Sequence, residues 1–147
     1  MKLKVAWIGK TKEPAIRSLT DEYLTRITRY ADVESLVLKD EAELRPLAEG
    51  ARNKPRLLLV LLDSRGKQIS SEELAEFIRH QQDSGSQPLL FAIGPADGFH
   101  DESRRAASFV ISLGKMTLPH ELARVILLEQ IYRALTILAG HPYHCGH

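Results

Sequence analysis

Residues 57–62 read Leu-Leu-Leu-Val-Leu-Leu, and residues 89–93 read Leu-Leu-Phe-Ala-Ile. Neither stretch alternates apolar with polar residues, so both sides of each segment are expected to be buried. Continuous apolar runs of this length are typical of the central strands of a parallel sheet, whose two faces are covered by helices. These two stretches therefore predict an α/β fold.

The segments around these two runs alternate between strand and helix patterns. Short apolar runs predict three more strands, at residues 3–8, 33–38 and 109–111. Longer amphipathic stretches predict helices at residues 14–30, 41–51, 71–82 and 121–138, and Asp-Ser-Gly-Ser at residues 83–86 predicts a turn. Pro14 suits the first turn of a helix, and Ser70 suits an N-cap. Strands that alternate with helices predict a mostly parallel sheet flanked by helices.

The composition is that of an ordinary globular protein. The chain has 147 residues, of which 44% are hydrophobic and 27% charged, so we expect a single domain over residues 1–147. No apolar run approaches the roughly 20 residues of a membrane span, and the first residues lack the apolar core of a signal peptide. Cys145 is the single cysteine, which fits a reducing compartment. We therefore expect a soluble, cytoplasmic protein without membrane attachment.

The charges are balanced in total and polarised along the chain. Lys and Arg number 20 against 19 Asp and Glu, which argues against a simple polybasic nucleic-acid coat. Residues 1–30 carry seven basic and three acidic side chains, whereas residues 31–50 carry two basic and six acidic ones. A local basic patch that faces phosphate and ordinary solvated helix faces both remain open.

Two loops follow predicted strands at the edge of the sheet where parallel α/β proteins bind ligands. Residues 94–98 follow the second apolar run, and Gly94 lets the backbone approach a ligand because it has no Cβ. Residues 112–120 mix apolar side chains with a glycine, a hydroxyl and a proline, so they can form the wall of an apolar pocket. A plain turn for the first loop and a connection capped by Thr117 or His120 for the second are the structural alternatives.

The predicted helix at residues 121–138 is apolar on nearly all sides. Its two apolar sides are Leu122, Ile126 and Ile137, and Leu127, Ile131, Ala134 and Leu138. One sheet face covers only one side of a helix, so we expect the other side to meet a second subunit in a homodimer. Arg124 and Arg133 need an acidic partner, a phosphate or a polar interface site. Pairing within the chain, with Glu121 or Glu129, is the structural alternative.

The chain ends in Gly-His-Pro-Tyr-His-Cys-Gly-His, residues 140–147. Three histidines and a cysteine suggest zinc, but no second ligand pair has the spacing of a structural site, so no metal is predicted. Tyr143 offers a stacking ring, and His144 offers a base near neutral pH, with a frayed tail as the alternative. The sequence has no Gly-x-Ser-x-Gly and no His-Glu-x-x-His motif, which favours a reaction carried by a cofactor over hydrolysis.

Several of these segments together resemble one family. Its carboxyl-terminal signature is similar to Met116-Thr117-Leu118-Pro119-His120, Arg124-Val125, residues 129–134 (Glu-Gln-Ile-Tyr-Arg-Ala) and Pro142-Tyr143-His144. On these residues the chain resembles the ribosomal RNA large subunit methyltransferase H (RlmH) family, of the SPOUT class. The opening Met-Lys-Leu-Lys-Val and the loop from Ile93 to Gly98 also match, so the resemblance covers essentially the whole chain.

The resemblance implies a fold, an activity and a site. The fold is SPOUT-type α/β with a carboxyl-terminal trefoil knot, in a homodimer. The activity is methylation of N3 of a pseudouridine in 23S rRNA on the assembled ribosome, with S-adenosylmethionine as cofactor. The implied methyl-donor residues are Leu62, Gly94, Leu113, Gly114, Lys115, Met116, Thr117 and Leu118. His144 is the candidate acceptor of the N3 proton, with Tyr143 and Arg133 beside it to position the RNA or the dimer.

Two functions of other classes remain open from the sequence. A nucleotide- or flavin-binding module of flavodoxin type fits the alternation of strands and helices, although residues 9–14 lack the Ser/Thr-rich phosphate cradle of such modules. A ribosome-binding factor without catalysis would keep the fold and lose the activity. Binding of S-adenosylmethionine separates an enzyme from both alternatives.

Overall fold

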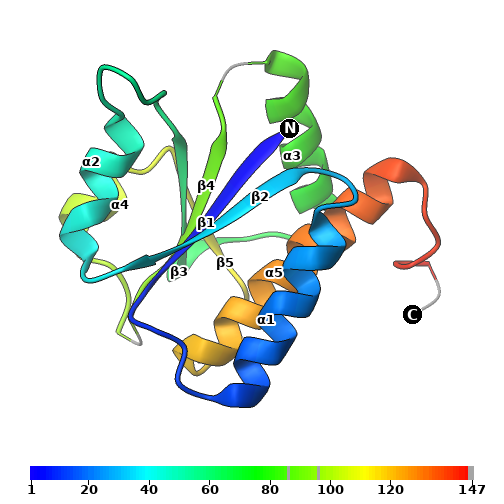
Figure 1. Ribbon diagram of the computed structural model, residues 1–147, viewed down its shortest axis with the longest axis horizontal. Helices are drawn as coiled ribbons and strands as arrows, with labels where there is room; N and C mark the ends of the chain where they lie inside the picture. The colour runs from blue at the N-terminus through cyan, green and yellow to red at the C-terminus, as the bar shows by residue number, and fades with distance from the viewer. Residues whose placement is uncertain (86, 96, 146–147) are drawn as a thin grey trace.

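The computed structural model describes residues 1–85, 87–95 and 97–145 (Figure 1). Its elements are β1 (Lys2–Ile8), α1 (Pro14–Ile27), β2 (Asp32–Leu38), α2 (Leu44–Glu49), β3 (Leu58–Gln68), α3 (Ser71–Ser84), β4 (Leu89–Ile93), α4 (Asp101–Ala106), β5 (Phe109–Ser112) and α5 (His120–Ala139). The predicted turn, the loop after β4 and the tail each extend beyond the described residues, at Ser86, at Ala96, and at Gly146 and His147.

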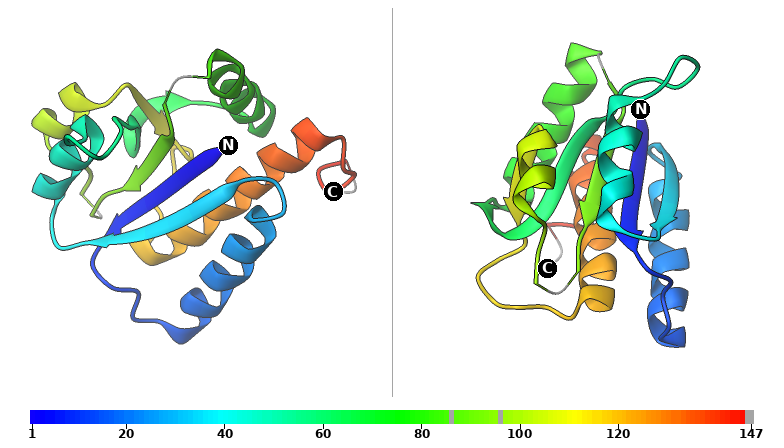
Figure 2. Two further views of the ribbon diagram at one scale, coloured as in Figure 1. Left: turned by 45° about the horizontal axis from the view of Figure 1, so that its top comes forward. Right: turned by 90° about the vertical axis from the view of Figure 1, so that its left-hand side faces the viewer.

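The five strands form one sheet in the order β2-β1-β4-β3-β5, and every neighbouring pair is parallel. Helices cover both faces, with α2 and α4 on one side and α1, α3 and α5 on the other (Figure 2). Alternate side chains of the strands point to opposite faces and form two hydrophobic clusters. Phe91 belongs to the cluster under α1, α3 and α5, and Leu90 belongs to the cluster on the side of α2. The predicted parallel sheet flanked by helices is therefore confirmed, and all strands end at one edge.

The apolar run of residues 57–62 forms only the first half of its strand. β3 continues through polar residues to Gln68, and its register against β5 shifts between Leu62 and Lys67. Gly66 permits the close approach of the two strands, because a Cβ there would lie 2.6 Å from the carbonyl carbon of Ile111. Pairing with β5 therefore extends β3 beyond its own apolar signal.

The predicted helices lie at the observed positions, but the accuracy of their predicted ends differs from helix to helix. Ser70 and Glu73 form a capping box at the start of α3, which confirms the predicted N-cap. The predicted helix at residues 41–51 was wrong in extent, because the structure has a 3₁₀ turn at Glu41–Glu43 and then the six-residue α2. Gly50, with a φ of 77°, ends α2. The six-residue α4 has no buried residue, so no apolar pattern could have predicted it.

Helix α5 is covered within the chain more fully than its sequence suggested. It packs against α1 and α3 as well as the sheet, which buries Leu127, Ile131 and Ala134. This side of α5 is therefore covered within the chain, whereas Leu122 on the other apolar side stays 39% exposed, and the homodimer and the knot stay predictions. The alternative of a connection capped by Thr117 or His120 was wrong, because Pro119 is the N-cap and makes no side-chain hydrogen bond. Within the described residues, no helix has the length and hydropathy that crossing a membrane requires.

Candidate functional site

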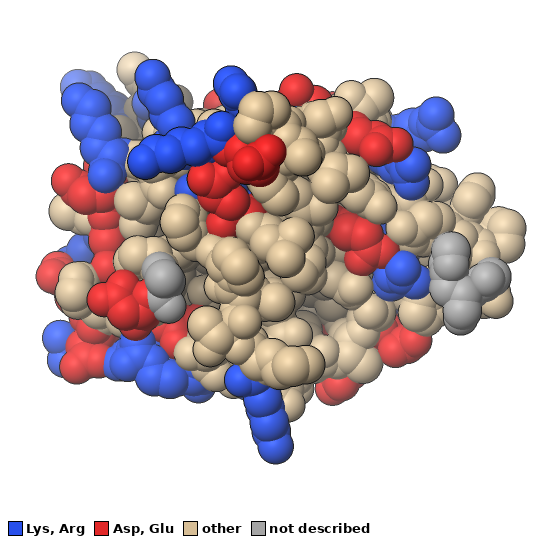
Figure 3. Space-filling view, turned by 90° about the horizontal axis from the view of Figure 1, so that it is seen from below, with Lys and Arg blue, Asp and Glu red and all other residues tan. Residues whose placement is uncertain are grey.

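A pocket of about 120 Å³ opens at the carboxyl edge of the sheet, between the ends of β4 and β5, the middle of β3 and the start of α5. Figure 3 looks onto this edge and shows a mostly uncharged central surface with charged side chains around its rim. The topology explains the position, because parallel strands bring the loops after β4 and β5 to one edge, beside the middle of β3.

Seven of the eight predicted methyl-donor residues line this pocket: Leu62, Gly94, Leu113, Gly114, Met116, Thr117 and Leu118. The eighth, Lys115, does not line it. The Ser112 hydroxyl closes a turn at the start of the loop, since it accepts from the Gly114 N–H at 3.1 Å and donates to the Gly114 carbonyl at 2.9 Å. The structure therefore brings together a residue of β3 and residues of the loops after β4 and β5, which the resemblance assigned to one site.

The loop beyond this turn leaves main-chain groups available. Within the described residues, the backbone N–H groups of Lys115, Met116, Thr117 and Leu118 donate no hydrogen bond. Leu62 and Ile93, both more than nine-tenths buried, add apolar surface to the pocket. An apolar wall beside free main-chain donors suits a flat heterocycle with a polar edge.

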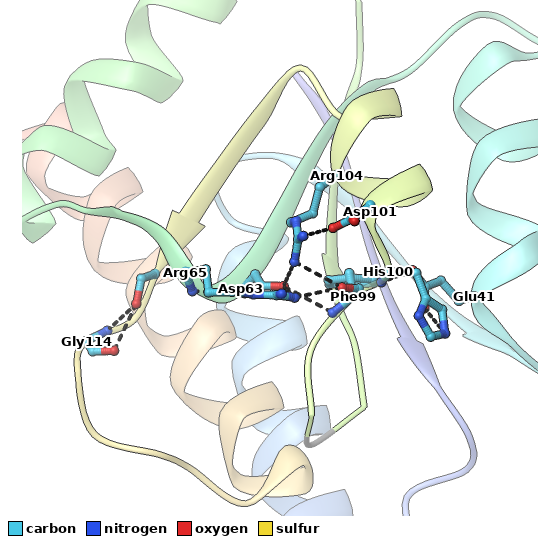
Figure 4. A network of polar contacts seen from close by, with 9 residues as sticks. Glu41, Asp63, Arg65, Phe99, His100, Asp101, Arg104 and Gly114 are labelled. Atoms are coloured by element: carbon cyan, nitrogen blue, oxygen red, sulfur yellow. Dashed lines mark hydrogen bonds and ion pairs between the residues drawn. The ribbon is translucent and has the colours of Figure 1, made fainter.

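Asp63 also lines the pocket, and the sequence analysis missed it (Figure 4). Its Oδ1 accepts from the backbone N–H of Arg65 at 2.9 Å and from Arg65 Nε at 3.2 Å. Its Oδ2 accepts from Arg65 Nη2 at 3.2 Å and from the backbone N–H of Phe99 at 3.0 Å. The sequence signal that could have found it is a lone carboxylate directly after the apolar run.

The contacts of Asp63 identify it as a support for the pocket wall. Burial raises the pKa of this carboxyl, but the hydrogen bonds from the side chain and backbone of Arg65 and from the backbone of Phe99 outweigh burial and lower the pKa to about 2. Gly98, with a φ of +86°, approaches so closely that a Cβ would lie 3.1 Å from Asp63 Oδ2. The carboxylate thus ties the loop after β4 to β3, with both oxygens already occupied.

The three predicted catalytic residues lie together at the other end of α5. Arg133 pairs with Glu129 at 2.6 Å, which confirms the alternative of pairing within the helix. Arg133 Nη1 also lies 3.0 Å from Nδ1 of His144, and Nε2 of His144 lies 2.6 Å from Oε1 of Glu72 in α3. The Tyr143 hydroxyl donates to Glu129 at 3.0 Å. The tail is therefore ordered on α3 and α5 up to this point, which answers the alternative of a frayed end.

The surroundings of Tyr143 keep its phenol protonated. Burial raises its pKa, and its side-chain hydrogen bonds with Tyr23 and Glu129 raise it further. The guanidinium of Arg133 lies 4.9 Å from the centre of the Tyr143 ring. A protonated, partly buried tyrosine can position groups by hydrogen bonding but does not act as a base at neutral pH.

Within one chain these residues do not reach the pocket. The pocket is lined by Ala123, and Arg133 lies ten residues further along α5, about 15 Å at 1.5 Å per residue. A second hollow lies beside the pocket and shares Leu62, Ser112 and Leu113 with it, and it extends to Gln130. The predicted catalytic residues are thus brought to one another and not to the predicted donor residues.

Comparison with known proteins was made for the whole chain. The sequence profile of the family described as "Predicted SPOUT methyltransferase" matches residues 1–144. A protein of Koribacter versatilis (strain Ellin345) named ribosomal RNA large subunit methyltransferase H is 57% identical over 148 residues, which is 100% of each chain. The chain belongs to the ribosomal RNA large subunit methyltransferase H family. Its relative of that name from Geobacter sulfurreducens is 47% identical and covers 98% of this chain and 99% of its own.

A solved structure extends the comparison to the fold of this RlmH family member. The SpoU methyltransferase AviRb from Streptomyces viridochromogenes, in complex with the cofactor AdoMet, superposes with a TM-score of 0.53. It covers 89% of this chain and 57% of its own, at 15% identity. The SPOUT methyltransferase fold is therefore shared at low sequence identity. Among the described residues of the chain, no group of three His, Cys, Asp or Glu side chains is placed to hold a metal ion.

Proposed function

We propose that the chain is a cytoplasmic enzyme that uses S-adenosylmethionine to methylate N3 of a pseudouridine in 23S rRNA on the assembled ribosome. Family membership supports the coarser part, since relatives at 57% and 47% identity are named large subunit rRNA methyltransferases. The observation that carries the proposal is the pocket at the carboxyl edge, which seven of the eight implied donor residues line.

The residues of the pocket fit the methyl donor. Leu62 and Leu118 offer apolar surface for the adenine ring, and the N–H groups of residues 115–118 are free to donate to its polar edge. When bound, S-adenosylmethionine supplies a methyl group activated by its sulfonium. The chain then has to hold and orient two reactants so that the methyl group lies in line with the acceptor nitrogen.

The acceptor nitrogen sets a second requirement. N3 of pseudouridine is a weakly acidic imide nitrogen, and its proton must leave before or during methyl transfer. His144 is the proposed proton acceptor, and the Arg133 guanidinium at 3.0 Å from its Nδ1 is placed to stabilise the resulting anion. Because Arg133 occupies Nδ1 of His144, proton acceptance at this atom requires Arg133 to leave the contact when RNA binds.

We propose that the active enzyme is a homodimer with shared sites. In one chain Arg133 lies about 15 Å along α5 from Ala123 in the pocket wall, and none of Arg133, Tyr143 and His144 lines the pocket, so one copy alone does not bring a base to its own donor. Apolar side chains beside the pocket are exposed, with Met116 83% and Leu122 39% accessible. A second copy seated on these residues would bring its own tail to the pocket.

The test is mass spectrometry of 23S rRNA from a strain that lacks the gene. Loss of a methylpseudouridine, restored by the intact gene, is the expected result, and an unchanged signal would contradict the function. Calorimetry with S-adenosylmethionine tests the pocket separately. The His144→Ala variant should bind the donor normally and lose most methyl transfer to purified ribosomes. Full transfer by this variant would exclude His144 as the base.

A further inference from the structure

The loop between β1 and α1, residues 9–13, is held in place by one turn of α5 that is far from it in sequence. The Glu121 carboxylate accepts from the backbone N–H of Lys12 at 3.1 and 3.2 Å and from that of Glu13 at 3.1 Å. These bonds lower the pKa of Glu121, because the backbone N–H of Glu13 and then that of Lys12 stabilise its charged form. The start of the loop is tied separately, since the Gly9 N–H donates to the Leu38 carbonyl at 2.9 Å.

Arg124 holds the same loop from beneath. It is 1% exposed, and it donates to the carbonyl of Ile8 at 2.9 Å and to the hydroxyl of Thr11 at 2.8 Å. Its guanidinium lies 5.4 Å from the Trp7 ring, and its Nε is buried without a partner in the described residues. No carboxylate bonds to it there, so the expected pairing with Glu121 or Glu129 was wrong for this arginine.

A buried guanidinium without a bonded carboxylate is costly, and burial lowers the pKa of Arg124. The contacts of Arg124 fix the position of residues 9–13, and none of these residues belongs to the described core clusters. A role for the loop at the surface explains the arrangement better than a role in packing.

The loop lies beside the donor pocket. β1 pairs with β4, with Trp7 opposite Ile93, so residues 9–13 leave the sheet next to Gly94 in the pocket wall. Within the same turn of α5, His120 and Ala123 line the pocket while Glu121 and Arg124 hold the loop. The loop is thus attached to the same turn of α5 that lines the pocket.

The exposed charged side chains of the loop are Lys10, Lys12 and Glu13. Lys10 and Lys12 are exposed and form no ion pair within the described residues, whereas the carboxylates nearby are directed at backbone N–H groups. Such a pair of ammonium groups suits the phosphates of a nucleic-acid backbone, which protein contacts use to set register.

We propose that residues 9–13 are a docking surface for RNA phosphates beside the nucleotide to be methylated, with Lys10 and Lys12 as the contacts and Arg124 and Glu121 as positioning residues. The inference rests on the proposed function, because it takes RNA as the substrate. Phosphates held at this surface set which nucleotide reaches the pocket.

The experiment measures methyl transfer to purified ribosomes at several salt concentrations. The Lys10→Glu/Lys12→Glu variant should raise KM for ribosomes at least about tenfold. The slope of log KM against log salt concentration should also become shallower, by the amount expected for the loss of about two phosphate contacts. Its kcat and its affinity for S-adenosylmethionine should stay unchanged. The matched control is Lys2→Glu/Lys54→Glu, the same charge change on exposed lysines at the opposite edge of the sheet, which should leave KM within about twofold.

Conservative variants separate positioning from folding. Lys10→Arg/Lys12→Arg should keep the wild-type KM, because the cations remain. Arg124→Lys keeps a charge but loses the two-pronged contact to Ile8 and Thr11, so it should raise KM without altering kcat or donor affinity. A KM and salt dependence unchanged in the glutamate variant would overturn the docking surface while leaving the proposed function intact. Donor binding without any transfer to ribosomes by the wild-type chain would overturn both.

Discussion

Arg133 Nη1 lies 3.0 Å from Nδ1 of His144, and this contact determines where the imidazole carries its proton. A guanidinium can only donate hydrogen bonds, so Nδ1 of His144 must be the acceptor. The proton then resides on Nε2, which donates to Glu72 at 2.6 Å. The tail of the chain is therefore held by an Arg–His–Glu relay between α5 and α3.

The first prediction is that His144 is the Nε2–H tautomer in the protein without RNA. Two-bond proton–nitrogen correlation spectra at pH 8 should show a non-protonated Nδ1 for this residue. Arg133→Met removes the donor and should bring the Nδ1–H form into the spectrum. Arg79→Met is the matched control, because Arg79 pairs with Glu76 on α3 and leaves His144 untouched. A wild-type spectrum with the proton on Nδ1 would show that the relay is absent.

The second prediction concerns acid stability. The pKa of Asp63 is lowered from 3.8 to about 2, so the carboxylate stabilises the fold above pH 4, and this stabilisation is lost as the pH falls towards 2. About two pKa units correspond to about 2 kcal/mol. Asp63→Asn should therefore lower the free energy of unfolding by about 2 kcal/mol at pH 7. Near pH 2 the wild type and the variant should converge.

Urea unfolding between pH 2 and pH 7 measures this difference. Asp21→Asn, an exposed change on α1, serves as the control and should stay within about 0.5 kcal/mol of the wild type at neutral pH. A constant gap between wild type and Asp63→Asn across the whole range would mean that the effect of Asp63 comes from packing and not from charge.

The third prediction concerns the pocket wall at Gly94. A Cβ at this position would lie 2.9 Å from Cζ of Phe99, whose ring is 2% exposed and has little room to move. Gly94→Ala should cost about 1–3 kcal/mol in stability and weaken binding of S-adenosylmethionine. Phe99→Leu creates space, so Gly94→Ala should cost less in that background. Equal costs in both backgrounds would show that the ring is not the obstacle.

How much of the fold could be predicted depended on the kind of signal that each segment carries. The apolar runs at residues 57–62 and 89–93 predicted two central strands, because consecutive apolar residues indicate a strand that is buried on both faces. Residues 63–68 carry no such pattern and become a strand only through pairing with β5, a contact that no local signal reveals. α4 was missed for the same reason, since it is short and exposed.

Most of the residues that line the pocket could be named from the sequence, but their positions relative to Asp63 and His144 could not. Gly94 and residues 113–118 follow strands, so the topology rule for parallel sheets placed them at one edge. Asp63 escaped because its role comes from bonds to Arg65 and Phe99, which are set by tertiary structure. The distance between the pocket and His144 also required the structure, because it depends on where the tail folds back onto α3.

The fourth prediction tests the shared site of the proposed homodimer. Thr117→Trp fills the pocket of one copy, and Tyr143→Ala/His144→Ala removes the tail groups of another. Each variant alone should be inactive on ribosomes. If the tail of one subunit serves the pocket of its partner, a mixed dimer holds one site in which both parts are intact.

Mixing the two variants in equal amounts, with subunit exchange, should restore about a quarter of the wild-type activity, since half of the dimers are mixed and each has one of two sites intact. If each subunit served its own pocket, every site would carry a defect and the mixture would stay inactive. Native mass spectrometry of the mixture provides the control for exchange, because the mixed dimer differs in mass from both parent dimers. Sedimentation of the variants checks that both remain dimers, so that a silent mixture contradicts the shared site and not the assembly.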